Sequence, residues 1–156
     1  MLDFATKDLA FAIVHHLLIF ALAGVIAFEV GVAKQGLNAG DIRRLGKVDA
    51  WYGILAGLII VVGFSRAVFA AKGWAYYSVN HFFWAKIGAF AIVGLLSIQP
   101  TMAYIRWRAA QKDDPSFLPN ARQIATVRRF LWAEVFVFAF IPVFAAAMAR
   151  GYGMPG

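Results

Sequence analysis

Ionisable side chains lie inside stretches of this sequence that are otherwise apolar enough to enter a lipid bilayer. The first such stretch, AIVHHLLIFALAGVIAFEV, carries the adjacent histidines His15 and His16 and, near its end, Glu29. Ionisable groups at membrane depth are rare, and they usually face the interior of a helix bundle, where they have a partner or a function. The chemistry open to them includes ligation of iron by an imidazole and pairing of cations with buried anions.

Depth along the chain groups these residues into two layers. If the apolar stretches are antiparallel helices rising 1.5 Å per residue, then His15, Arg66 and Lys86 all lie about 8–9 Å below one membrane surface. The second layer, nearer the opposite surface, is acidic and consists of Glu29, Asp49 and Glu134.

Helical geometry separates the histidines from one another. At 100° per residue, His15 is about 40° from Glu29 and shares its face, whereas His16 is about 140° away. His81 lies at the water interface and is about 140° from Lys86 on the third stretch. We therefore expect His15 and Lys86 to face the interior, although an error of one residue in register would exchange His15 and His16.

An imidazole and two cations at equal depth on three helices suit a b-type haem. Helix bundles hold haem between facing helices, and histidine is a common ligand of haem iron. We expect His15 to be the iron ligand, with His16 as the alternative, and Arg66 to pair with a propionate. Lys86 would pair with a propionate or ligate the iron. The structural alternatives are a histidine that hydrogen-bonds a neighbouring helix, cations that snorkel to the surface, and acids of the second layer that pair with cytoplasmic lysines and arginines.

Four apolar stretches supply the elements that would position these groups. The chain has 156 residues, of which 62% are hydrophobic and 15% charged, whereas a soluble domain is nearer half apolar and a quarter charged. Each stretch has about 20–25 residues, enough to cross a hydrocarbon core of about 30 Å. We predict an all-α, antiparallel up-down bundle of four transmembrane helices. It forms a single integral membrane domain over residues 1–156, with spans at about 9–33, 50–71, 82–104 and 130–149.

The positions of the basic residues behind the net charge of +7 indicate a membrane topology and not nucleic-acid binding. Most lysines and arginines follow the first and third spans, and short loops rich in these residues stay in the cytoplasm. We therefore expect a bacterial inner membrane protein with both termini outside, two basic loops that contact anionic lipid head groups, and no nucleic-acid partner. There is no cysteine, which excludes disulfides and thiolate metal sites.

Local motifs predict the shapes and contacts of the spans. Pro100 and Pro142 lie inside the third and fourth spans, where each removes a backbone hydrogen bond and alters helix shape. Gly53 and Gly57 form a GxxxG motif that allows close helix contact. That contact could be within the bundle or between subunits, so a homo-oligomer stays open.

Capping signals mark two helix starts in the connections. Asp41 is placed to cap a short surface helix in the first loop. Asn120 and Gln123 have the spacing of a capping box that leads into the fourth span.

The segment KGWAYYSVNHFFWAKIGAFAIVGLLSIQPTMAYIRW, the paired histidines and the closing AMARGYG resemble an uncharacterised family of small bacterial membrane proteins. The resemblance covers nearly the whole chain. It implies four helices in a membrane and supplies no activity.

A more distant likeness is to the four-helix, HemJ-type protoporphyrinogen oxidases. Those proteins have a histidine early in the first span and a lysine near the start of the third, positions that match His15 or His16 and Lys86. The likeness implies haem b bound by the histidine and a catalytic lysine acting on a porphyrin substrate. HemJ-type proteins have one histidine where this chain has two, and their surrounding tryptophans and arginines have no match here.

These observations lead to an expected function with two alternatives. We expect an integral membrane protein that binds b-type haem for electron transfer or a haem-linked oxidation, with a redox partner or a porphyrin as substrate. The first alternative is a non-enzymatic transporter or assembly protein whose intramembrane polar residues are structural. The second is a divalent-metal site built from His15, His16 and a carboxylate, although Glu29 lies about 20 Å further along the helix.

Overall fold

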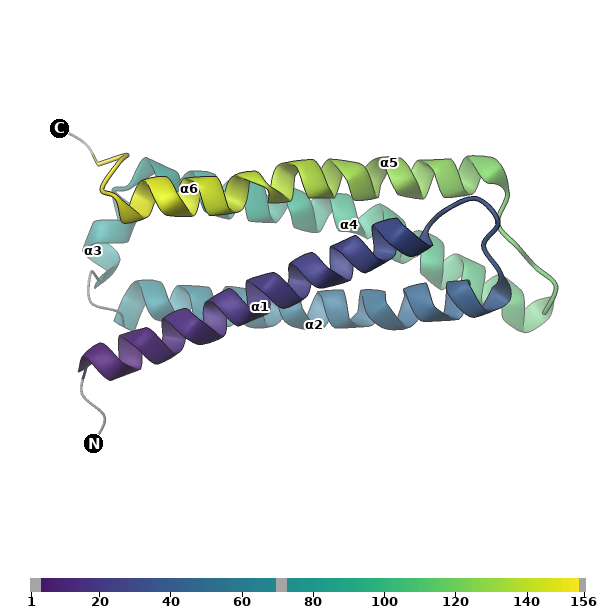
Figure 1. Ribbon diagram of the computed structural model, residues 1–156, viewed down its shortest axis with the longest axis horizontal. Helices are drawn as coiled ribbons and strands as arrows, with labels where there is room; N and C mark the ends of the chain where they lie inside the picture. Colours follow the sequence, from purple (N-terminus) through teal and green to yellow (C-terminus); the bar gives the residue numbers. More distant parts are fainter. Residues whose placement is uncertain (1–3, 70–72, 155–156) are drawn as a thin grey trace.

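Four long helical rods form a bundle in the computed structural model, which describes residues 4–69 and 73–154 (Figure 1). The described residues contain helices and connecting turns but no strand, so the all-α prediction is confirmed. The helices are α1 (Phe4–Val32), α2 (Ala39–Phe69), α3 (Gly73–Ser78), α4 (His81–Asp113), α5 (Ala121–Phe138) and α6 (Phe140–Ala149).

Each of the four rods is long and apolar enough to cross a membrane, as predicted, with α5 and α6 together forming the fourth. The helices run beyond the predicted spans, because α2 already begins at Ala39 and α4 continues to Asp113. Because the backbone hydrogen bonds of a helix are made within the helix, it can continue from the hydrocarbon into water without losing them. The predicted end of the second span at residue 71 lies outside the described residues.

The start of α2 corrects one expectation. Asp41 does not cap a separate surface helix: it lies in the first turn of α2, which continues without a break into the span. The preceding Asn38 caps the start of α2 instead. Its Oδ1 accepts from the Asp41 amide at 2.9 Å, and the Asn38 amide donates to Asp41 Oδ2 at 3.1 Å. Ile42 and Leu45 are fully buried in the same turns, so core packing ties this segment to the bundle.

The fourth rod starts and breaks as its sequence dictates. The capping box is confirmed: Asn120 Oδ1 accepts from the Gln123 amide, and Gln123 Oε1 accepts from the Asn120 amide, each at 2.9 Å. Pro142 has no N–H for the carbonyl of Phe138 four residues earlier, and α5 ends at that residue. Pro100, in contrast, lies inside the continuous helix α4.

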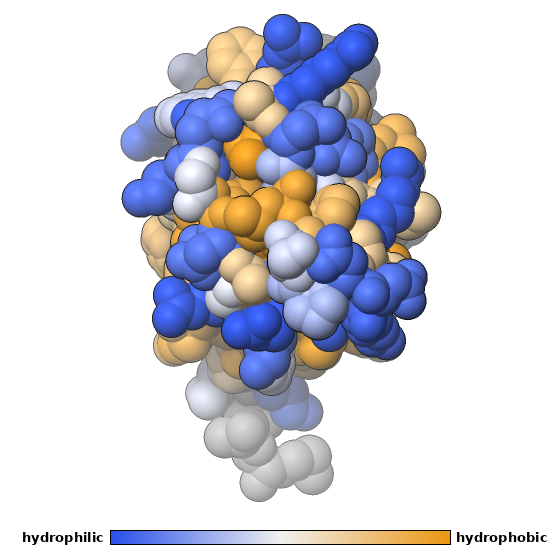
Figure 2. Space-filling model, turned by 90° about the vertical axis from the view of Figure 1, so that its right-hand side faces the viewer, coloured by the Kyte–Doolittle hydropathy of each residue, from blue (hydrophilic) through white to orange (hydrophobic). Residues whose placement is uncertain are grey.

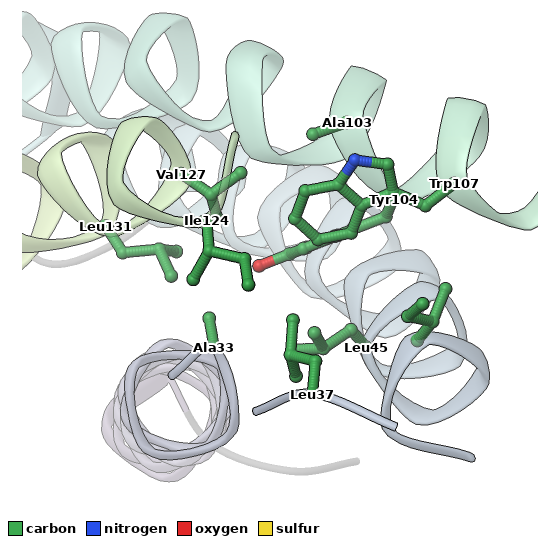
Figure 3. Packing of buried hydrophobic residues seen from close by; sticks show 10 residues of the cluster. Ala33, Leu37, Leu45, Ala103, Tyr104, Trp107, Ile124, Val127 and Leu131 are labelled. Carbon is green, nitrogen blue, oxygen red and sulfur yellow. The ribbon is translucent and has the colours of Figure 1, made fainter. Parts of the chain in front are cut away.

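The rods pack as two pairs. α1 lies against α2, and α4 lies against α5 and α6, while contacts of α2 with α4 and of α1 with α5 join the pairs. One cluster of buried side chains, around Tyr104 and Trp107, fills the space where α1, α2, α4 and α5 meet (Figure 3). Large apolar side chains such as Phe20 and Phe136 are instead about 70% exposed, which suits a surface solvated by lipid.

The GxxxG motif is not used inside this bundle. Gly53 and Gly57 are both exposed on α2, and a Cβ added at either would meet nothing within 4 Å. Helix contact within the chain is therefore not the reason for these glycines.

The two ends of the bundle are formed by different elements. α1 begins and α6 ends at one end, beside α3, and we call this the terminal end (Figure 1). The α1–α2 and α4–α5 connections lie at the other, the loop end, where hydrophilic side chains surround an apolar centre (Figure 2). The predicted up-down order thus places both basic loops at the same end.

Asn80 fastens the terminal end, a role that the sequence did not reveal. Its side chain is fully buried, and its Oδ1 accepts from the amides of Phe82 at 2.9 Å and Phe83 at 3.2 Å to cap α4. Its Nδ2 donates to the carbonyl of Tyr152 at 3.0 Å. One side chain therefore joins the start of α4 to the segment after α6.

Replacing Asn80 should destabilise the protein more than replacing an ordinary helix cap. Asn80→Ala removes the cap, worth about 1 kcal/mol, and also the bond to Tyr152, worth about 1 kcal/mol more. Asn120→Ala is the matched control, because Asn120 caps α5 without holding a distant segment. Thermal unfolding in detergent measures both, and equal losses would show that the tie to Tyr152 contributes nothing.

Candidate functional site

The structure brings together the imidazole and the two cations that the sequence placed at equal depth. His15 on α1, Arg66 on α2 and Lys86 on α4 lie close enough for their charges to interact. Asp8 on α1 lies beside Arg66. All four side chains are partly buried near the terminal end, and we call them the terminal polar group.

His15 faces the bundle and His16 does not, in agreement with the helical angles. The His15 ring lies against α2 at Gly63, where an added Cβ would be 3.1 Å from the ring carbon Cε1. Its Nδ1 is buried and has no hydrogen-bond partner. The exposed His16 ring instead pairs with its own helix, with Nδ1 at 2.6 Å from the carbonyl oxygen of Ala12. The imidazole available inside the bundle is therefore that of His15.

Arg66 has a neighbour that the sequence analysis missed. Asp8 Oδ1 lies 3.8 Å from Arg66 Nε, and neither atom has a hydrogen-bond partner. Asp8 precedes the predicted first span, so its charge raised no question about membrane depth. Its spacing of seven residues from His15, two helical turns, was the available signal that both share a face.

Lys86 and His81 lie differently on α4. The Lys86 ammonium lies 5.3 Å from the centroid of the Phe83 ring, within the range of a cation–π contact. Within the described part of the chain, no carboxylate oxygen lies within 4.0 Å of it. His81 is the exposed first residue of α4, at the interface as expected. Among residues 4–69 and 73–154, Lys86 therefore makes no ion pair, although it belongs to the same polar group as Asp8.

The acidic layer forms a second group in the half of the bundle nearer the loop end. Glu29 and Glu134 are 2% and 0% exposed, and each lies near enough to Asp49 for their charges to interact. The Thr101 hydroxyl donates to Asp49 Oδ1 at 2.6 Å. By contrast, Glu29 Oε1, both carboxyl oxygens of Glu134 and the Tyr104 hydroxyl are buried without a partner.

Both glutamates occupy positions that helix packing normally gives to leucine. Glu29 continues the buried stripe of Leu22 and Ile26 on α1, and Glu134 follows Leu131 on α5. The structural alternative had these acids pairing with the lysines and arginines of the loop end. No such ion pair is present among residues 4–69 and 73–154, so loop cations do not compensate these carboxyls.

The divalent-metal alternative does not match the structure. No cluster of three or more histidine, aspartate or glutamate side chains in the described ranges is arranged to hold a metal ion. The rings of His15 and His16 are nearly perpendicular, with centroids 6.3 Å apart, because adjacent residues on a helix point in different directions. The two histidines therefore do not form the expected pair of ligands.

Comparison with known proteins gives the family. Residues 7–153 match the family described as Predicted membrane protein (DUF2214), whose function is unknown. The chain belongs to this family. The predicted resemblance to an uncharacterised membrane protein family is thus confirmed, and the protein is an integral membrane protein. No curated protein and no solved structure matches it.

The bond between Thr101 and Asp49 should stabilise the contact of α2 with α4. Thr101→Val keeps the side-chain volume but removes the donor, and we expect the free energy of unfolding to fall by about 0.5–2 kcal/mol, the range for hydrogen bonds between membrane helices. Thr126→Val is the matched control, because the Thr126 hydroxyl donates only to Arg122 on its own helix. If both variants unfold alike in detergent, the interhelical bond is not a stabilising contact.

Proposed function

We propose that this membrane protein binds a b-type haem at the terminal polar group and serves electron transfer or a haem-linked oxidation. The observation that carries the proposal is the His15 imidazole, which faces the bundle with Nδ1 buried and unpartnered. A histidine that joined two helices structurally would be hydrogen-bonded across them. An inward imidazole without such a bond fits a ligand of a group held between the helices.

The surrounding side chains fit the charges of haem. Arg66 and Lys86 are cations beside the imidazole, and haem propionates are anions that a membrane interior would otherwise reject. Arg66 Nε makes no hydrogen bond even to the nearby Asp8, and Lys86 has no carboxylate neighbour in the part of the chain described, so both retain donors. Gly63 leaves the room in which the His15 ring lies.

Each residue has a role in this proposal. His15 would ligate the iron, Arg66 would hold a propionate, and Lys86 would hold the other propionate or be a second iron ligand. Haem, when bound, would supply one-electron redox chemistry.

The likeness to HemJ-type proteins extends the proposal to a reaction. Lys86 would then be the catalytic group for a porphyrinogen substrate, whose electrons would pass to the haem and from there to a redox partner. His16 is the ligand only if α1 is rotated from the orientation described above.

A second candidate function is supported by the acidic group. Glu29 and Glu134 are fully buried with unpaired oxygens, and intramembrane carboxyls often lie on ion or proton paths. A small transporter or assembly protein would use them in this way. A colourless preparation from haem-replete cells would favour this candidate over the first.

The proposed location is a bacterial inner membrane with both termini outside. The excess of lysine and arginine at the loop end keeps that end in the cytoplasm. A reporter fused after Gly156 should therefore be active if it works only after export, and silent if it works only in the cytoplasm. The reverse pattern would invert the topology and place the terminal polar group in the cytoplasmic half.

Removal of single histidines tests the haem proposal. Iron ligation fixes haem in its site, so His15→Ala should abolish the native Soret and α/β bands of the detergent-purified protein. His81→Ala should leave the spectrum nearly unchanged, because His81 is exposed at the start of α4.

His16→Ala is the matched control for His15→Ala, since it removes an imidazole from the adjacent exposed position. We expect it to retain haem at matched protein levels. Loss of haem from the His16 variant alone would exchange the roles of the two histidines. Retention of haem in all three variants would place the ligand elsewhere and overturn the site.

A further inference from the structure

A groove of about 540 Å³ lies at the loop end, between the connection after α1 and one face of α5. The face of α5 contributes one or two residues from each successive turn, and the connection contributes two more. The groove is lined by Lys34, Gln35, Ala125, Arg128, Arg129 and Trp132.

Two hydrogen bonds hold the walls of this groove together. Arg128 Nη1 donates to the carbonyl oxygen of Ala33 at 2.8 Å, which occupies an acceptor at the end of α1. Gln35 Nε2 lies 3.5 Å from the carbonyl oxygen of Ala121, at the start of α5. These two contacts between the end of α1 and α5 therefore fix the width of the groove.

The groove is strongly positive. Lys34, Arg128 and Arg129 line it, and none of them has a carboxylate oxygen within 4.0 Å among residues 4–69 and 73–154. No acidic side chain lines the groove. Three cations thus meet in the groove, and none of them is paired with an acid of the described residues. Lys34 and Arg129 are also exposed.

An apolar track leads away from the cations toward the middle of the bundle. Trp132 is 54% exposed, and Phe136 and Phe140 follow on the same face with exposures of 68% and 41%. The rings of Phe136 and Phe140 are in contact, with centroids 5.3 Å apart. Cations at the helix end, then tryptophan, then phenylalanine reproduce the order of charge and polarity along a phospholipid molecule.

We propose that this groove is a binding site for one anionic phospholipid. Its phosphate and negative head group lie among Lys34, Arg128 and Arg129, which donate charge-assisted hydrogen bonds to the phosphate oxygens. One acyl chain runs past Trp132 along Phe136. A zwitterionic phospholipid has the same chains but no net negative charge, so it neutralises less of the groove.

Quenching by bromine on the acyl chains tests this proposal with the intact protein in nanodiscs. Phosphatidylglycerol is the minor lipid in phosphatidylcholine, and bromine is placed on the chains of one lipid or the other at the same mole fraction. The difference between the wild-type protein and Trp132→Phe isolates the fluorescence of Trp132. We expect bromine on phosphatidylglycerol to quench this signal about two-fold more than bromine on phosphatidylcholine.

Three variants distinguish the groove from general basicity. Lys34→Gln with Arg129→Gln should abolish the preference, and so should Ala125→Phe, which fills the groove without changing the charge. Arg43→Gln with Arg44→Gln removes the same charge from exposed positions outside the groove and should keep the preference. Arg128 is left in place because it also bonds to Ala33.

Other results would overturn the proposal. Equal quenching by the two brominated lipids shows that no anionic lipid is selected. Loss of the preference in the Arg43 and Arg44 control assigns it to overall charge. Displacement of the preference by inorganic phosphate in the buffer identifies a site for free anions instead. None of these measurements depends on whether haem binds at the other end of the bundle.

Discussion

Hydrocarbon offers no hydrogen-bonding partner, and this constraint decides where every polar side chain within the spans must lie. The apolar side chains that a soluble protein would bury are exposed here, while Glu29 and Glu134 are inside. Between the helices a polar group can meet another polar group, as Thr101 meets Asp49. The reactive and hydrogen-bonding side chains of the spans consequently lie on the faces that point into the bundle.

The two polar groups differ in how completely the bundle closes around them. The acidic group lies where α1, α2, α4 and α5 all meet, next to the packed cluster around Tyr104. The backbone of α1 runs close to that of α2 but not to those of α4 and α6 within the described residues. Side chains of the terminal polar group accordingly remain partly exposed, with about 30% for both Asp8 and Arg66. A ligand can reach this group more readily than the acidic one.

Periodicity and composition were sufficient to predict the spans, the two layers and the inward direction of His15, because each follows from one helix at a time. The neighbour of Arg66 was missed because Asp8 lies before the apolar run that drew attention to the first span. The cap role predicted for Asp41 was wrong because Ile42 and Leu45 are buried against other parts of the chain. These tertiary contacts make the segment around Asp41 part of α2. The groove beside Arg129 could not be inferred, since it depends on the distance between two helices.

One helix links all of these features. Asp8, His15, Leu22 and Glu29 follow each other at intervals of seven on α1, and such a seam drifts by only about 20° per heptad on a straight helix. At the terminal end the seam meets α2, where Asp8 approaches Arg66 and His15 lies on Gly63. At the loop end it meets α5, where Arg128 holds the carbonyl of Ala33. Figure 1 shows the reason, since α1 crosses the bundle obliquely instead of running parallel to α2. A change in the tilt of α1 would therefore alter the terminal polar group, the acidic group and the basic groove together.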